Sequence, residues 1–149
     1  MSTHEHTIKR LVAYYIQKFG TNDPFIIAQN LGIKVFYGEI GPAFGMYKYI
    51  EHTKCIFIND YLEYPMKKVV MAHELGHAIM HWKENCYYIA KYTFLLTSRY
   101  EQEANKFAAY LLITDDMLLE AAHTEMTIDD FSSKYGIVDN ELIKFRIDI

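Results

Sequence analysis

Length, composition and charge already exclude several classes of protein. The 149 residues are 51% hydrophobic and include 13 Tyr and 9 Phe, which excludes a disordered chain and supplies the core of one domain over 1–149. The formal net charge of −4 argues against nonspecific binding to nucleic acid, which depends on a surplus of Lys and Arg facing the phosphates. We therefore expect a folded single domain that makes no direct contact with nucleic acid.

The sequence predicts neither a signal peptide nor a membrane-spanning segment. Residues 1–10 lack the apolar core of a signal peptide, and no apolar run approaches the roughly 18 residues of a membrane span. The two cysteines, Cys55 and Cys86, form no C-x-x-C pair and are expected to be free thiols. These features predict a cytoplasmic protein without a membrane partner.

The first part of the chain is predicted to form two helices and then a small sheet, within a helical N-terminal region over 7–31. Apolar residues at helical spacing predict a helix over 7–19, and the polar residues before Pro24 predict the start of a second helix. Short segments rich in β-branched and aromatic residues predict three strands within 33–59, at 33–37, 44–50 and 54–59. We expect a small antiparallel three-stranded sheet, antiparallel above all from Phe44 onward, that packs against the next helix.

The rest of the chain is predicted to be mainly helical, which makes the fold class α+β. Helices are expected over 65–81 and 98–113, joined by an irregular connector that includes 83–92. The C-terminal region, 114–147, is expected to contain one helix to about Ala122 and then a helix–glycine–helix pattern.

The helix–glycine–helix pattern resembles the outline of a DNA-binding helix-turn-helix. However, its second helix mixes acidic with basic side chains, and such a face would meet phosphates poorly: Asp139, Glu141, Lys144, Arg146 and Asp148. Ordinary packing between helices is the favoured interpretation.

The most informative motif is His73-Glu74-Leu75-Gly76-His77, which lies inside the predicted helix over 65–81. Residues four apart lie one turn apart on the same side of a helix, so His73 and His77 can bind one metal ion. Glu74 projects about 100° round the helix axis, where a carboxylate can take a proton from a water molecule beside the metal. Gly76 costs about 1 kcal/mol in a helix interior and suggests that another backbone packs against this turn. The pattern predicts a zinc hydrolase.

A catalytic zinc site needs a third protein ligand. His81 is about 12 Å from His73 along a straight helix and cannot share the ion. In the helix over 98–113, the angular position of Glu101 faces the apolar stripe, whereas Glu103 points away from it. Glu101 could instead form a capping box with Ser98, which leaves Glu103 as the substitute ligand. Asn105, one turn after Glu101, could accept a hydrogen bond from a ligating histidine.

These motifs resemble the ImmA/IrrE family of metallo-endopeptidases, also called the DUF955 domain. The likeness covers about Lys54 to Thr114 and rests on His73-Glu-Leu-Gly-His77 followed by Glu101-x-x-Ala-Asn105. The resemblance implies a gluzincin-like site with His73, His77 and Glu101 as zinc ligands, Glu74 as general base and Asn105 supporting a ligand. It also implies a protein substrate, namely a cytoplasmic helix-turn-helix repressor of a mobile element, prophage or stress regulon.

Several alternatives stay open at this point. A non-hydrolytic zinc protein that binds the repressor, or a DNA-binding regulator with a structural metal, would retain part of the pattern. Two imidazoles and a carboxylate also accept divalent ions other than zinc. The donor that would stabilise the developing oxyanion is one of several unranked candidates: Tyr87, Tyr88, Tyr92, Arg99 and His123.

Overall fold

The structure is a computed structural model that describes residues 3–88 and 98–147. In chain order the described elements are α1 (Thr3–Phe19), α2 (Pro24–Asn30), β1 (Lys34–Gly38), β2 (Gly45–Ile50), β3 (Thr53–Asn59), α3 (Tyr64–Met80), β4 (Cys86–Tyr88), α4 (Arg99–Leu112), α5 (Asp115–His123), α6 (Ile128–Tyr135) and α7 (Asn140–Ile147). The predicted fold class, a mainly helical α+β protein, is confirmed. Part of the predicted connector, 89–92, lies outside the described residues.

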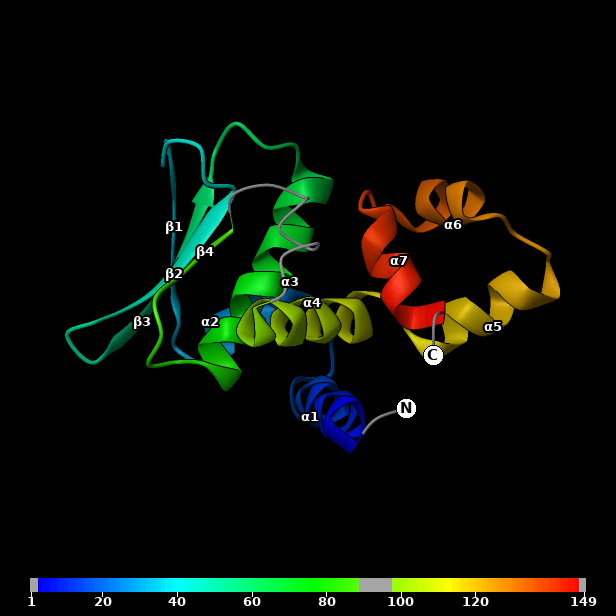
Figure 1. The fold of residues 1–149 in the computed structure, drawn as a ribbon, viewed down its shortest axis with the longest axis horizontal. Helices are drawn as coiled ribbons and strands as arrows, with labels where there is room; N and C mark the ends of the chain where they lie inside the picture. The colour runs from blue at the N-terminus through cyan, green and yellow to red at the C-terminus, as the bar shows by residue number, and fades with distance from the viewer. Residues whose placement is uncertain (1–2, 89–97, 148–149) are drawn as a thin grey trace.

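The elements form a sheet, a central pair of helices and a C-terminal helical group (Figure 1). Helix α3 packs against β2 and β3 on one side and makes its most extensive contact with α4 on another. Helices α1 and α7 also contact α4. The helix that carries the HExxH motif is therefore enclosed on several sides by the rest of the fold.

The sheet has four strands in the order β1-β3-β2-β4 and differs in two respects from the three-stranded sheet predicted. Strands β2 and β3 are antiparallel, as expected, but β1 pairs with β3 in parallel. The chain reverses direction in the β2–β3 hairpin, so β3 runs in the same direction as β1 and pairs with it in parallel. The additional strand β4 pairs antiparallel with β2 and is only three residues long, too short for alternation to reveal it in the sequence.

The start of α2 shows how local sequence sets a helix boundary. Asp23 is the N-cap, and its carboxylate accepts hydrogen bonds from the backbone N–H groups of Phe25 and Ile26. Pro24 occupies the first turn, where its missing N–H costs nothing. A cap among the polar residues before Pro24 is therefore confirmed, and the structure identifies it as Asp23.

Gly76 lies at a close contact between α3 and α4. A Cβ atom added at Gly76 would lie 3.1 Å from Cβ of Phe107 and 3.3 Å from Cα of Ala104. Both of these residues belong to α4 and are fully buried. The glycine therefore brings the two helices together beside the histidines, which confirms the close packing predicted for this turn.

The C-terminal helices pack onto the same core. Leu142 and Ile143 of α7 are buried, and Arg146 donates a 2.8 Å hydrogen bond from Nε to the backbone carbonyl of Ile113. Its Nη2 also donates to Asp115 at 2.6 Å. Among the residues described, no helix combines the length and apolar character needed to cross a membrane.

Candidate metal centre

Two helices bring three of the predicted site residues together. His73 and His77 lie one turn apart on α3, and both side chains are fully buried. Glu101, in the first turn of α4, faces them: its Oε2 is 2.9 Å from His73 Nε2 and its Oε1 is 3.0 Å from His77 Nε2. The two Nε2 atoms are 3.2 Å apart. One nitrogen or oxygen of each residue lies within 4.8 Å of the others.

The alternative role considered for Glu101, a capping box with Ser98, is not formed. Ser98 is the N-cap of α4 but makes no side-chain capping hydrogen bond. The Glu101 carboxylate instead contacts both imidazoles, and only 13% of its side chain is exposed. Histidine contacts lower the pKa of Glu101 well below its ordinary value although burial opposes this shift.

Asn105 lies one turn after Glu101, as predicted, and contacts the opposite nitrogen of His73. Its Oδ1 is 2.7 Å from His73 Nδ1 and accepts a hydrogen bond from that nitrogen when it is protonated. Proton placement on Nδ1 leaves the Nε2 lone pair directed at the shared carboxylate, where a cation could bind. Asn105 is fully buried.

Glu103, the substitute ligand considered from the sequence, faces a different partner. Its Oε1 is 3.1 Å from His81 Nε2, and it lies outside the cluster formed by the two imidazoles and Glu101. Helical geometry predicted that Glu103 would point away from the apolar face, but the residue is buried because His81 covers it. The contact between His81 and Glu103 was not anticipated from the sequence.

Glu74 has a different environment from Glu101. The residue is fully buried, and neither carboxylate oxygen has a hydrogen-bond partner among the described residues. Burial, and secondarily the negative charge of Glu101, raises the pKa of Glu74 well above its ordinary value. Its side chain lies against the start of β2, since a Cβ added at Gly45 would be 3.3 Å from Glu74 Cγ.

The donor set fits a divalent metal. Two imidazole nitrogens face one carboxylate, which is the combination found in a class of catalytic zinc sites that keep a coordination position for water. The unpartnered oxygens of Glu74 are a second indication of a site for a ligand, because buried polar atoms normally have hydrogen-bond partners. His73, His77 and Glu101 are the residues that could hold the ion.

The oxyanion candidates remain unranked. Tyr92 lies outside the described residues, and only the backbones of Tyr87 and Tyr88, in β4, are described. Arg99 is at the surface with its Nε 3.6 Å from Glu103, and His123 ends α5.

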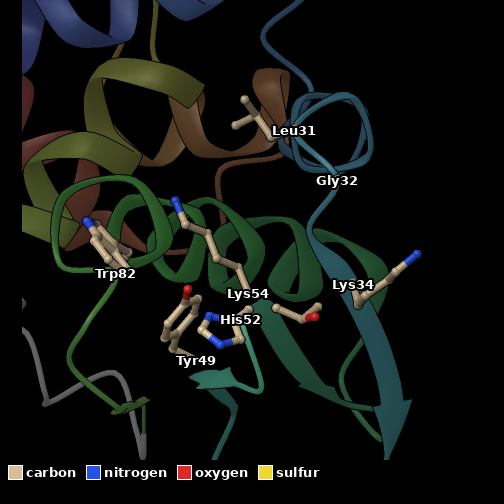
Figure 2. A pocket seen from close by; sticks show the side chains of 8 residues that line it. Leu31, Gly32, Lys34, Tyr49, His52, Lys54 and Trp82 are labelled. Carbon is tan, nitrogen blue, oxygen red and sulfur yellow. The ribbon is translucent and has the colours of Figure 1, made fainter.

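A separate groove of about 460 Å³ is lined by residues of β2 and β3, of the turn between them, of the segment around β1 and by Trp82, and Figure 2 shows its lining. Tyr49, His52, Lys54 and Trp82 gather on one side of it, while Lys34 points away from them (Figure 2). Burial lowers the pKa of Lys54. The groove lining includes none of the residues of the HExxH motif.

A buried HExxH helix whose imidazoles face a carboxylate from a second helix defines the metallopeptidase class. Comparison with known proteins gives the family. Residues 28–147 match peptidase family M78, described as the IrrE N-terminal-like domain. An uncharacterized immunity region protein 2 of Bacillus phage phi105 is 34% identical over 131 residues, which are 87% of this chain and 83% of the phage protein.

A second relative carries an enzymatic name. Metallopeptidase ImmA of Bacillus subtilis (strain 168) is 33% identical over 119 residues, 76% of this chain and 68% of that protein. This chain therefore belongs to the ImmA/IrrE family of metallopeptidases.

Proposed function

We propose that this protein is a zinc-dependent endopeptidase that cleaves a cytoplasmic helix-turn-helix repressor of a mobile element, prophage or stress regulon and thereby releases transcription. The observation that carries the proposal is the pairing of a cluster of two imidazoles and a carboxylate with the buried, unpartnered carboxylate of Glu74. The immunity-region name of the phage relative and the metallopeptidase name of the bacterial relative support the substrate class and the activity.

In this proposal His73, His77 and Glu101 hold the zinc. A bound zinc ion supplies Lewis acidity, which lowers the pKa of water and polarises a carbonyl group. Asn105 holds His73 in the tautomer that presents Nε2. These residues orient the site before the substrate arrives, so the entropy cost of assembling it is met by folding.

Glu74 is the general base. Its carboxylate accepts a proton from the attacking water and then donates that proton to the leaving amine of the cleaved peptide bond. The raised pKa of Glu74 suits this exchange because a carboxylic acid with an elevated pKa holds the proton more readily between the two transfers. The burial of the side chain excludes bulk water as a competing proton acceptor.

The test uses purified, zinc-loaded protein and the repressor encoded beside its gene. We expect the wild type to cleave the repressor, and Glu74→Gln to lose at least about 100-fold in cleavage rate, the lower range for a general base, while retaining stoichiometric zinc. Glu63→Gln is a matched control because Glu63 is exposed at the start of the same helix and makes no side-chain capping bond. Equal cleavage by both Gln variants would remove Glu74 from the mechanism. Binding of the repressor without cleavage by the wild type would favour the non-hydrolytic alternative.

A further inference from the structure

His81 and Glu103 continue the polar cluster beyond the three proposed ligands. His81 Nδ1 lies 3.0 Å from His77 Nδ1, and His81 Nε2 lies 3.1 Å from Glu103 Oε1. Both His81 and Glu103 are buried, each with 7% of its surface exposed. The side chains therefore form a continuous hydrogen-bonded chain from His77 through His81 to Glu103.

Backbone geometry at the end of α3 makes this contact possible. His81 is the C-cap residue, with φ −127° and ψ 42°, and its N–H donates to the carbonyl oxygen of His77. The ring of His81 lies 5.2 Å from the ring of His77, measured between centroids. Tyr100 of α4 also packs against His81, with the ring centroids 4.5 Å apart. The ring is thus held between the two helices.

Only one distribution of protons satisfies this chain when both rings are neutral and Glu103 is ionised. A carboxylate accepts and cannot donate, so His81 carries its proton on Nε2 and donates it to Glu103. His81 Nδ1 is then an acceptor and accepts the hydrogen bond that His77 Nδ1–H donates. The remaining nitrogen, His77 Nε2, keeps a free lone pair that faces Glu101 and His73.

We propose that His81 and Glu103 are positioning residues that fix His77 in the tautomer that binds the metal, an inference that rests on the proposed function. They do for His77 what Asn105 does for His73, with one difference. Asn105 is a neutral acceptor, whereas the His81 path ends on the carboxylate of Glu103. Neither residue touches the metal or the substrate in this proposal.

The test measures zinc affinity by competition with a chromophoric chelator, using the full-length protein. Removing an outer partner of a metal ligand typically weakens affinity by about 10- to 100-fold. We expect such a loss for His81→Phe, which keeps a ring but has no acceptor for His77 Nδ1. His81→Asn restores an acceptor oxygen near that nitrogen and should recover part of the affinity. Tyr100→Leu removes the packing on His81 but no member of the chain, and should bind zinc like the wild type.

A second readout observes the tautomers directly. In zinc-loaded protein with ¹⁵N-labelled histidine, we expect NMR to place the proton of His77 on Nδ1 and that of His81 on Nε2. Glu103→Gln removes the charge at the end of the chain and should weaken zinc binding less than His81→Phe does. Circular dichroism identifies any variant that fails to fold, and if His81→Phe does not fold, His81→Leu, which also lacks an acceptor, takes its place.

The outcomes separate this inference from the proposed function. Unchanged zinc affinity and an unchanged Nδ1–H signal of His77 in folded His81→Phe or His81→Leu, which both lack an acceptor, would overturn the chain while the zinc peptidase stands. A wild type that binds no zinc would overturn the proposed function, and this inference with it. Weaker binding by His81→Phe, partial recovery by His81→Asn and the predicted tautomers together would establish the role of His81.

Discussion

The cluster between α3 and α4 and the groove beside Trp82 are both lined with polar side chains, but they differ in how those side chains are held. In the cluster, His73 and His77 are fully buried, and each faces Glu101 within 3.0 Å. In the groove, Trp82 and His52 are exposed to solvent. The volume of a cavity is therefore a poor guide to the reactive site. Convergence of buried polar groups is the better one.

The backbone differs between the two regions as well. The cluster lies between regular helices, with Gly76 allowing their close approach. The groove is bordered by the turn between β2 and β3, where Glu51 and His52 adopt φ values of 46° and 64°. Residues with a side chain adopt such values at a cost in energy. Each region can therefore be disturbed separately by substitution.

The largest expected effect is loss of metal from the cluster. Glu101→Ala removes the carboxylate shared by both imidazoles, and we expect zinc affinity to fall by more than about 100-fold, the upper range for loss of an outer partner. Glu103→Ala should weaken binding less, because Glu103 contacts His81 and not the imidazole pair. Chelator competition measures both. Loss of metal from Glu103→Ala alone would show that the ligand assignment is wrong.

The next prediction concerns Glu74 in metal-free protein. Because its pKa is raised in the folded state, that state binds more protons than the unfolded chain between the ordinary and the raised pKa. Stability therefore falls as pH rises through this window, by at most about 1.4 kcal/mol per pH unit for one proton. Below the ordinary carboxyl pKa the contribution of Glu74 is fully present.

Urea denaturation of the chelated wild type and Glu74→Gln at several pH values measures this effect. The difference between them should grow in favour of Glu74→Gln as pH rises. Burial lowers the pKa of His77, so the contribution of His77 to stability rises with pH. Both proteins contain His77, and its contribution therefore cancels when their free energies of unfolding are subtracted. A constant difference across the pH range would show that Glu74 has no raised pKa.

A smaller effect is expected at Gly76. In an open helix, Gly→Ala stabilises by about 1 kcal/mol, but here the new Cβ would lie 3.1 Å from Phe107. Overpacking of this kind costs about 1–3 kcal/mol, so we expect Gly76→Ala to lower the free energy of unfolding. Adding Phe107→Leu should reduce the penalty of Gly76→Ala. A double-mutant cycle in urea measures the coupling, and stabilisation by Gly76→Ala alone would contradict the close packing.

The sequence predicted the parts of the cluster that depend on helical spacing. His73, Glu74 and His77 follow from positions on one helix, and Glu101 and Asn105 follow from their angular positions on another. The contact between His81 and Glu103 could not be predicted in the same way, because it depends on how α3 ends and on the packing of two helices. The distance along the helix from His73 excluded His81 as a ligand, but the position of His81 one turn after His77 was left unused.

The sheet shows the same limit. Strands β2 and β3 are joined by a short turn, so their antiparallel pairing follows from the sequence. The parallel pairing of β1 and the short strand β4 depend on contacts between distant segments, which local propensity does not encode. The division of the chain into a single domain stays a prediction.

The smallest expected effect is confined to the turn beside the groove. Asn-Gly is the preferred pair for a two-residue hairpin turn with positive φ at both positions. Replacing Glu51 and His52 by Asn and Gly should raise the free energy of unfolding by about 1 kcal/mol, since strained residues cost of that order. Ile50 and Thr53 pair across this turn, so the register is preserved. Thermal denaturation measures the gain. Zinc affinity and repressor cleavage should equal those of the wild type, because no member of the metal cluster lies in the turn; a change in either would show that the groove and the cluster are coupled.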